Sequence, residues 1–295
     1  MKIFFDNVDF RSSSGPNSFG SKLARAFIQM GHQVVDKEPD VQLSFISISR
    51  KLAPTILRLD GIYFNSEQDW KSLNSPISES YKAADAIIVQ SIFNHRLVDR
   101  YFGRKDNVHV VGNGTCLDII EKIQPANISG LPREKVWFCA SSWRPHKRLS
   151  DNIRYFKQFA PHDAILLVAG NNAPDNIQDD RVKYIGNLNW DQLISVMKAS
   201  SHFIHLAWLD HCPNVVVDAR ASGCRIVCSS SGGTEEIAGT NSTVIEEDVW
   251  DFKPIKLYEP PSLDFSRSRN GLNYGSDIDI LEVAKKYLKI ITEEL

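Results

Sequence analysis

Short hydrophobic runs alternate along the first part of the chain with stretches in which apolar residues have helical spacing. The run at 2–6 is apolar and aromatic and predicts a strand. From Asn17 to Met30 apolar residues recur every three or four positions, which predicts a helix that Gly31 ends. Further strands are predicted at 32–35, 41–47, 55–60, 86–90 and 108–112, and further helices at 77–84 and 92–102.

A second alternating series follows a break in the pattern. Between Lys122 and Arg133 two prolines and a glycine interrupt the chain, and we interpret this stretch as a linker. The later strands are predicted at 135–140, 164–170, 182–186, 202–207, 225–229 and 242–246, and the helices near 150–159, 190–200 and 214–222. Residues 250–275 are expected to be irregular, and a helix over 278–294 closes the chain.

Strands that alternate with helices usually pair in parallel, with the helices on both faces of the sheet. The sequence therefore predicts an α/β protein with two Rossmann-like, doubly wound parallel-sheet domains, 1–130 and 131–275. Residues 276–295 form a C-terminal helix that could pack back on the first domain. A ligand is expected in the cleft between the domains, where the carboxyl ends of both sets of strands meet.

Composition and charge narrow the class of protein. The 295 residues are 42% hydrophobic and 24% charged, with a net charge of −2, which is typical of a globular protein. The near-neutral balance argues against a nucleic-acid binder. The longest apolar runs, such as 164–169, are far shorter than the ~20 residues that span a bilayer, so no transmembrane segment is expected, and peripheral membrane contact stays open. Asp6 and Asp9 interrupt the N-terminal apolar stretch, and the cysteine count is odd at 5; a cytoplasmic location is therefore expected.

Two aspartates around a predicted helix start are the first candidate site. Asp210 and Asp218 are eight positions apart, with Pro213 and Asn214 between them and Gly223 beyond them. Proline suits the first turn of a helix and glycine its end. If the helix begins near Asn214, two carboxylates flank free backbone amides that favour a phosphate, a combination that suits a sugar nucleotide. Taken alone, the residues also fit an ordinary surface helix with an acid in its first turn.

A basic loop after the first strand of the second half is the second candidate. Arg144 and Lys147 lie three positions apart in this loop. Arginine can bind phosphate through two parallel hydrogen bonds, and lysine adds a compact charge. A solvated basic loop is the alternative, but loops between a strand and the next helix end at the ligand-binding edge of a parallel sheet.

Together these stretches resemble the retaining nucleotide-sugar glycosyltransferases of glycosyltransferase family 4, which have the two-domain GT-B fold. The acid-x7-acid segment followed by Ala-Ser-Gly is the specific part of the resemblance. Residues 182–227 and 231–239 follow the family's C-terminal domain almost element by element, and weaker similarity is present at 17–35, 84–103 and 107–115. Here both acids are aspartate where the family usually has glutamate, each one methylene shorter. The first domain also lacks a convincing counterpart of the histidine that many members place near the reacting sugar.

The resemblance implies a role for each matching position. Asp218 would accept the ribose hydroxyls, Asp210 would contact the transferred sugar, and Arg144 and Lys147 would hold the diphosphate. Further donor contacts are implied at the helix start (Cys212, Asn214, Val215), at the border of the base (Gly170, Asn171, Ile185, Gly186) and near the diphosphate (Gly15). Asp60 ends a strand of the first domain and is the candidate on the acceptor side.

The expected function is that of a metal-independent retaining glycosyltransferase. It would move a hexose-type sugar from a nucleoside diphosphate sugar to a glycan or other hydroxyl acceptor, with no cofactor beyond that substrate. The acidic Asp277–Asp279 pair is interpreted as a helix cap and not as a metal site. Two alternatives stay open: a nucleotide-sugar epimerase or hydrolase on the same fold, and a weakly active nucleotide-sugar-binding protein, which the shorter acids favour.

Overall fold

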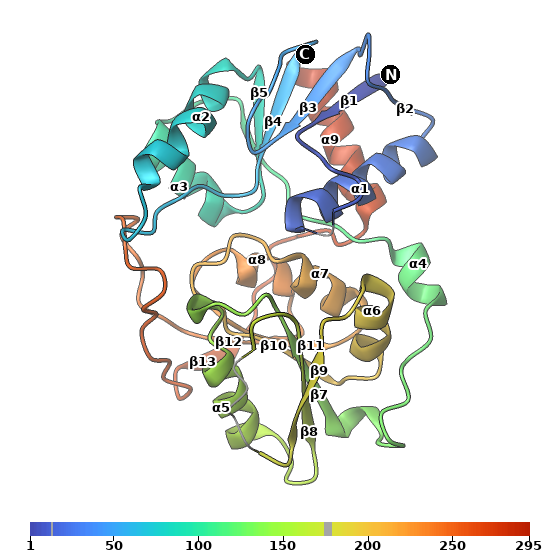
Figure 1. Ribbon diagram of the computed structural model, residues 1–295, viewed down its shortest axis with the longest axis vertical. Coiled ribbons are helices and arrows are strands. Elements are labelled where there is room, and N and C mark those ends of the chain that lie inside the picture. The colour runs from blue at the N-terminus through green and yellow to red at the C-terminus, as the bar shows by residue number, and fades with distance from the viewer. Residues whose placement is uncertain (13, 174–178) are drawn as a thin grey trace.

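Buried strands and amphipathic helices assemble into two α/β domains, one above the other, in the computed structural model, which describes residues 1–12, 14–173 and 179–295 (Figure 1). The upper sheet has the strand order β2-β1-β3-β4-β5-β6, and all its neighbouring strands are parallel. Its strands are β1 (Lys2–Asp6), β2 (Gln33–Val34), β3 (Val41–Phe45), β4 (Thr55–Leu59), β5 (Ala86–Val89) and β6 (Val108–Val110).

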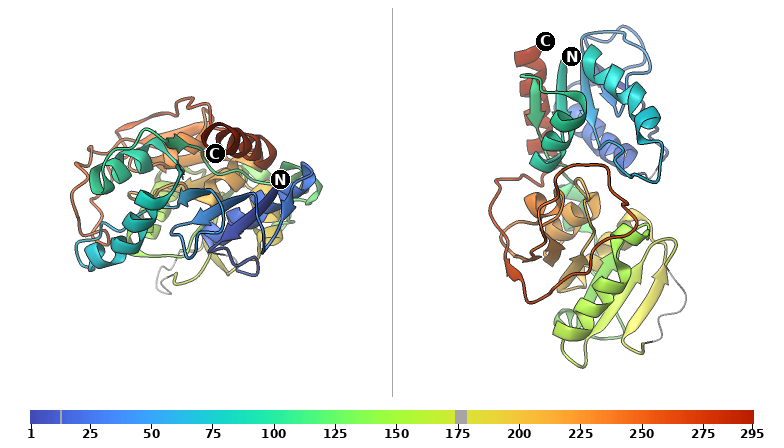
Figure 2. Two further views of the ribbon diagram at one scale, coloured as in Figure 1. Left: turned by 90° about the horizontal axis from the view of Figure 1, so that it is seen from above. Right: turned by 90° about the vertical axis from the view of Figure 1, so that its left-hand side faces the viewer.

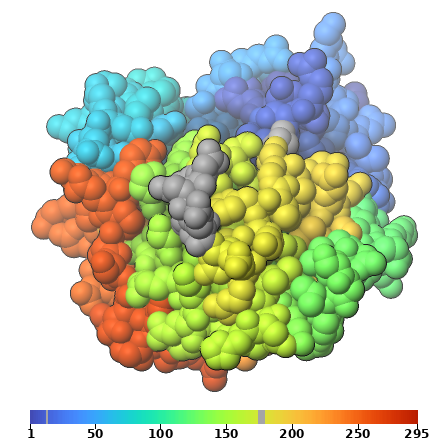
Figure 3. Space-filling view, turned by 60° about the horizontal axis from the view of Figure 1, so that its bottom comes forward, coloured from blue at the N-terminus to red at the C-terminus, as the bar shows by residue number. Residues whose placement is uncertain are grey.

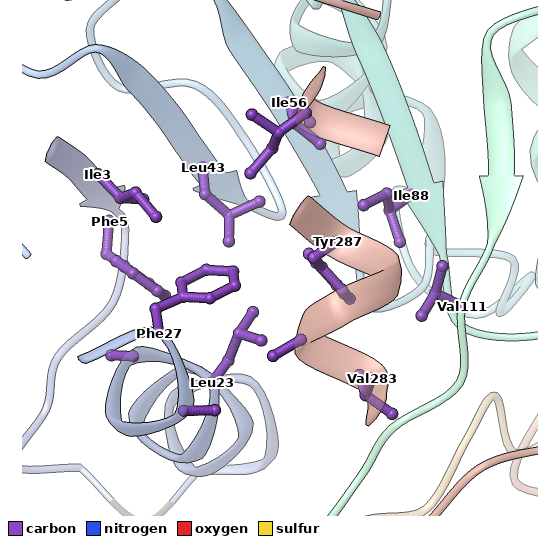
Figure 4. Close-up of a cluster of buried hydrophobic side chains, with 14 of the residues drawn as sticks. Ile3, Phe5, Leu23, Phe27, Leu43, Ile56, Ile88, Val111, Val283 and Tyr287 are labelled. Atoms are coloured by element: carbon purple, nitrogen blue, oxygen red, sulfur yellow. The ribbon is translucent and has the colours of Figure 1, made fainter. Parts of the chain in front are cut away.

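Helices cover both faces of this sheet. They are α1 (Gly15–Gln29), α2 (Trp70–Ala83), α3 (Ile92–Phe102) and α9 (Ile280–Glu294). The helices α1 and α9 pack side by side on one face, where Leu23, Phe27 and Tyr287 meet inward-facing strand residues such as Leu43 (Figure 4). The other face packs against α2 and α3. Because α9 is the last helix of the chain, both termini lie in this upper domain (Figure 1).

The lower sheet has seven strands in the order β13-β12-β11-β10-β7-β8-β9. They are β7 (Val136–Ala140), β8 (Ile165–Ala169), β9 (Val182–Gly186), β10 (His202–His205), β11 (Arg225–Ser229), β12 (Ser242–Ile245) and β13 (Ser268–Asn270). One face carries α6 (Trp190–Lys198), α7 (Asn214–Ala221) and α8 (Thr234–Ala238), and the other carries α5 (Leu149–Phe159). The expected fold class, two Rossmann-like domains with parallel-dominated sheets, is confirmed.

Three details differ from the sequence-based expectations. The edge strand β13 lies in the stretch expected to be irregular, and it pairs with β12 in antiparallel orientation. The helix α2 begins seven residues earlier than predicted, because the Asp69 side chain accepts a hydrogen bond from the amide of Ser72 and caps its start. The short helix α4 (Leu117–Lys122) precedes the expected linker. The expectation for Asp279 is confirmed, since its carboxylate caps α9 through the amide of Leu281.

The chain crosses between the domains twice, and the two crossings lie side by side. Thr115, on the way down from β6, forms a parallel bridge with Asp279, on the way up to α9. The amide of Thr115 donates to the carbonyl of Ile278 at 2.7 Å, and the amide of Ile280 donates to the carbonyl of Thr115 at 2.9 Å. The two chain connections therefore form one hydrogen-bonded pair of segments where the domains meet (Figure 2).

The irregular segment after β12 supplies a separate contact between the domains. Asn65, in the loop before α2, forms a parallel bridge with Ile255, and the amide of Ser66 donates to the Ile255 carbonyl at 2.8 Å. In the space-filling view this orange segment lies against the cyan part of the upper domain (Figure 3). Among the helices of the described ranges, none is long and apolar enough to cross a membrane.

Candidate active site

Asp210 lies in the loop between β10 and α7, at the level of the cleft, and two side chains hold its carboxylate. Lys147 Nζ lies 2.5 Å from Asp210 Oδ2, and His205 Nε2 lies 2.9 Å from the same oxygen. Among the described residues the other oxygen, Oδ1, accepts only the amide of His211, at 3.0 Å. The main chain of Asp210 is fixed as well, because its carbonyl accepts the amide of Gly233 at 2.7 Å. Two side chains therefore hold Oδ2, and one backbone amide holds Oδ1.

The partners of Asp210 decide its charge. Burial alone would raise the pKa of this carboxyl, but Lys147 and the hydrogen bond from His205 hold it well below its usual range. Burial lowers the pKa of His205, which therefore donates to Asp210 as a neutral imidazole. Asp210 is thus an anion at neutral pH and part of a compact charge pair. Lys147, which the family resemblance assigns to the diphosphate, is held by Asp210 in the structure.

Asp218 lies one turn inside α7, as its spacing predicts, and both its oxygens already have partners. Lys22, on α1 of the upper domain, contacts Oδ1 at 3.0 Å, and the Trp190 indole donates to Oδ2 at 3.0 Å. Lys22 Nζ also lies 3.1 Å from Thr115 Oγ1 and 5.0 Å from the centre of the Trp190 ring. Asp218 is buried, and its side chain is 4% exposed. The expected acceptor of ribose hydroxyls is therefore occupied by a cation from across the cleft.

Asparagine side chains connect the start of α7 to the upper domain. Asn214 Nδ2 donates to the carbonyl of Gly15 at 2.9 Å, which brings the start of α1 to the start of α7. Asn113 Nδ2 donates to Asn214 Oδ1 at 2.8 Å and to the Cys212 carbonyl at 3.0 Å. Four predicted donor-site positions are therefore neighbours here: Gly15, Cys212, Asn214 and Val215.

Asp60 follows β4 and faces the cleft from the upper domain. The buried Arg58 and the amide of Gln90 both contact its Oδ1, while its Oδ2 is buried and has no hydrogen-bond partner among the described residues. Burial raises the pKa of Asp60 although Arg58 opposes that rise. Arg58 is itself fixed by Tyr287 and Asn113, at 3.1 and 2.7 Å.

The side chains of the remaining predicted residues are not joined to this cluster within the described ranges. The Arg144 side chain is exposed and makes no hydrogen bond or ion pair in the part of the chain that the structure describes, while its carbonyl accepts the amide of Lys147 at 2.8 Å. Gly170 and Gly186 are hydrogen-bonded to each other, amide to carbonyl, at 2.8 Å. Asn171 accepts the amide of Trp143 through its carbonyl at 2.9 Å, and Ile185 is half-buried. A Cβ on Gly170 would lie 1.8 Å from the Ser141 carbonyl oxygen, so only glycine fits this loop.

The structure adds four residues that the sequence did not single out: His205, Lys22, Trp190 and Asn113. His205 is five positions before Asp210 and ends a strand at the sheet edge that was already expected to bind a ligand. Its position in the sequence could therefore have identified it as a candidate. Lys22, Trp190 and Asn113 reach the site only through contacts between elements far apart in the chain. Their spacing alone carried no such signal.

The cleft is largely filled by these contacts. A hollow of about 100 Å³ lies beside Asp210 and His211, between the loop after β4 and the loop before α7. A second one, of about 300 Å³, lies beyond Lys22 and Trp190 and is also lined by Arg25 and three serines. Sites for small ligands usually measure about 300–1,000 Å³. Within the ranges that the structure describes, no cluster of His, Cys, Asp or Glu is placed to hold a metal ion.

Comparison with known proteins finds a family model over the segment that carries these residues. Residues 121–251, which include Asp210, Asp218 and Lys147, match the family model described as Glycosyl transferases group 1. No curated protein matches the sequence. The matched segment is therefore similar to the group 1 glycosyltransferases, and it carries the principal candidate residues.

Solved structures share the fold over the whole chain at low identity. The Anabaena protein HepE, solved in complex with UDP-glucose, is 16% identical with a TM-score of 0.68, and 99% of each chain is covered. Sucrose-phosphate synthase from Thermosynechococcus elongatus is 12% identical with a TM-score of 0.66, covering 100% of this chain and 90% of that one. AviGT4, a glycosyltransferase of avilamycin A biosynthesis, is 12% identical with a TM-score of 0.61, covering 98% and 96%. The two-domain architecture is thus that of the GT-B glycosyltransferases.

Proposed function

We propose that this protein is a retaining glycosyltransferase of family 4 that transfers a hexose-type sugar from a nucleoside diphosphate sugar to a hydroxyl acceptor. The observation that carries the proposal is the Lys147–Asp210 pair at the start of α7, inside the segment that matches the group 1 glycosyltransferases. The neighbour HepE, which shares the fold, was solved with UDP-glucose, and this supports a nucleotide-sugar donor.

The proposed chemistry breaks the bond between the sugar C1 and the diphosphate oxygen. Negative charge then grows on the leaving phosphate, and Lys147 and the first-turn amides of α7, at Asn214 and Val215, would stabilise it. Arg144 is exposed and free to turn toward the same phosphate. Asp210 would contact the transferred sugar through its Oδ1, and Asp60 would face the acceptor from the upper domain. Retention of the anomeric configuration follows from the family resemblance.

A binding assay is the first test of this proposal. Thermal shift with UDP, GDP, ADP, dTDP and their glucose conjugates should show one nucleotide series that stabilises the protein, by ~2.7 kcal/mol at 100 times the dissociation constant. The preferred donor, mixed with a panel of sugar acceptors, should then release nucleoside diphosphate and form a glycoside of retained configuration. Stabilisation by none of these nucleotides would contradict the proposal.

A substitution then tests the role of the charge pair. Asp210→Asn should lower transfer by about 10²-fold or more, because the variant loses the anion that contacts the sugar. Asp163→Asn is the matched control, since Asp163 forms a surface pair with Lys135 at 2.5 Å away from the cleft. Equal activity of the two variants would remove Asp210 from the reaction.

One observation favours a second candidate, a nucleotide-sugar-binding protein with little turnover. Both oxygens of Asp218 are already bound by Lys22 and Trp190, so a ribose must compete for them. Under this alternative the donor binds, but Asp210→Asn and Lys147→Ala leave the slow background turnover unchanged. An epimerase or hydrolase would instead convert the donor when no acceptor is present.

A further inference from the structure

His211 comes from the lower domain, but its side chain inserts into the upper one. The imidazole lies 6.0 Å from the ring of Phe64 and 5.7 Å from the ring of Phe93, measured between ring centres. It lines the hollow of about 100 Å³ that also contains Asp210. At about 30 Å³ per water molecule, this space takes roughly three waters, or the hydroxyl-bearing edge of a sugar.

The hydrogen bonds of Asn94 fix which nitrogen of His211 carries the proton. Asn94 Nδ2 donates to the carbonyl of Leu59 at 3.1 Å, so the Asn94 Oδ1 oxygen faces His211 and can only accept. His211 Nδ1 lies 2.9 Å from that oxygen and must therefore be the protonated nitrogen. Burial lowers the pKa of His211 to about 4, so the ring is neutral near pH 7. Its Nε2 then has a lone pair and no proton.

No protein group within the described ranges uses this lone pair. His211 Nε2 makes no hydrogen bond there, and the residue is partly exposed and lines the hollow beside Asp210. The residue facing it is Gly61, which has φ +145° and follows Asp60. A Cβ at this position would lie 2.6 Å from His211 Nε2. Only a glycine therefore fits beside this edge of the ring.

We propose that His211 Nε2 is a substrate contact that accepts a hydrogen bond from a hydroxyl group of a sugar in the cleft. This inference rests on the proposed function and adds a residue to it. The ligand group is a neutral hydroxyl, because the site offers a fixed acceptor, and the nearby cation, Lys147, is held by Asp210. The hydroxyl belongs either to the transferred sugar or to the acceptor sugar. Both sources share the same chemistry.

The first experiment reads the tautomer directly, without any activity. Nitrogen-15 NMR of the imidazoles, with His211→Phe to assign the signals, should show His211 protonated at Nδ1 and unprotonated at Nε2 at pH 7. A proton on Nε2 would overturn the proposal even if the protein transfers sugar normally.

The second experiment removes the acceptor atom in two ways. His211→Phe keeps a ring between Phe64 and Phe93 but has no nitrogen, and Gly61→Ala keeps the imidazole but places a methyl group 2.6 Å from Nε2, so that the ring must shift away from its present position. His162→Phe, at an exposed position, is the control. Calorimetry with UDP alone should give the same dissociation constant for all four proteins within twofold.

The two sources of the hydroxyl are separated by the ligand used. If it belongs to the transferred sugar, both site variants bind UDP-glucose threefold to tenfold more weakly than the wild type. If it belongs to the acceptor, UDP-glucose binding is unchanged and the KM for the acceptor sugar rises by the same factor. Unchanged values in both arms overturn the proposal. A wild type that binds no nucleotide sugar at all refutes the proposed function itself, whatever the tautomer of His211.

Discussion

In the cleft, the charge and position of a single side chain are set by one or two neighbouring side chains. Lys147 and His205 converge on one oxygen of Asp210, at 2.5 and 2.9 Å, and their side chains are 17% and 4% exposed. An aspartate is one methylene shorter than a glutamate and reaches less far into a cleft. The strand residue His205 and the loop residue Lys147 therefore hold the shorter carboxylate in one position.

Replacing Lys147 should lower both the stability of the folded protein and its transfer activity. We expect Lys147→Met to lower the free energy of unfolding by about 2 kcal/mol, less than the ~3–5 kcal/mol of a fully buried pair because His205 still donates to Asp210. Urea denaturation measures this change. Lys51→Met is the control, since the Lys51–Asp85 pair is exposed and contributes at most about 1 kcal/mol. A smaller loss for Lys147→Met than for Lys51→Met would contradict this account.

His202 predicts how stability depends on pH. Its ring stacks on Trp137 with 3.9 Å between centres, and burial together with Arg225 and Arg133 lowers its pKa to about 4, from 6.5. The unfolded chain therefore binds the proton first, and stability is lost as pH falls from 6.5 toward 4. His202→Phe keeps the stack and should remove up to about 3 kcal/mol of this dependence. Chemical denaturation at pH 7 and pH 4 tests this, and an unchanged slope would exclude the histidine as its source.

The sequence predicts a site residue well when the residues that it contacts lie close to it along the chain. Asp210, Asp218 and Lys147 lie where the motif and the helix spacing placed them. Lys22 was not predicted, because it sits on α1, 196 positions from Asp218, and only domain packing brings the two together. His211 was not singled out from the sequence, since nothing in its neighbourhood along the chain indicates that Asn94 fixes its proton.

At the scale of elements, the start of α3 is capped from the other domain. The Glu236 carboxylate, on α8, accepts the amides of Ile92 and Phe93 at 2.6 and 2.9 Å. The side chain of Ser91 accepts the amide of Asn94 at 3.1 Å and completes the cap. A helix of the upper domain thus uses a side chain of the lower domain to satisfy its free amides.

This cap should be visible in amide exchange. Glu236→Ala is expected to lower stability by about 1 kcal/mol and to speed hydrogen exchange at Ile92 and Phe93, because both amides lose their acceptor. The control is Glu246→Ala, which removes only an exposed contact to Arg269. Mass spectrometry of exchanged peptides measures both variants. Equal exchange at the start of α3 would show that the cap contributes nothing.

The periodicity of the sequence predicted most of the helices of eight or more residues closely, with the start of α2 as the exception, and missed several short elements. The helices α1, α3, α5 and α7 follow their expected ranges to within two residues at each end. The missed elements, α4, α8 and β13, have 6, 5 and 3 residues, which is too short for a period to be recognised. Their ends are set by tertiary contacts, and β13 exists as a strand because β12 offers it an edge.

At the scale of the whole molecule, the structure shows a cleft that is closed by the protein's own side chains. Lys22 bridges to Asp218, Asn113 to Asn214, and His211 inserts beside Gly61. A nucleoside diphosphate sugar needs more room than the hollow beside Asp210 provides. Donor binding therefore requires the domains to separate or these side chains to move.

The Lys22 contact makes this requirement testable. On the proposed function, Lys22→Met frees the carboxylate of Asp218 for ribose hydroxyls, so UDP should bind threefold to tenfold more tightly. Small-angle scattering of the free protein should also show a larger radius of gyration. Lys51→Met again serves as the control. Weaker UDP binding by Lys22→Met would instead mean that Lys22 contacts the nucleotide itself.

The bridge between Thr115 and Asp279 limits how the domains can separate. Two connections placed far apart would permit only small displacements, and a single connection would permit twisting in any direction. Two adjacent segments tied by backbone hydrogen bonds act together as one pivot, and the favoured motion is a swing about one axis. Because the chain returns to its starting domain, a label at either terminus moves with the upper domain. Paired with a second label on the lower domain, it reports the swing as one distance.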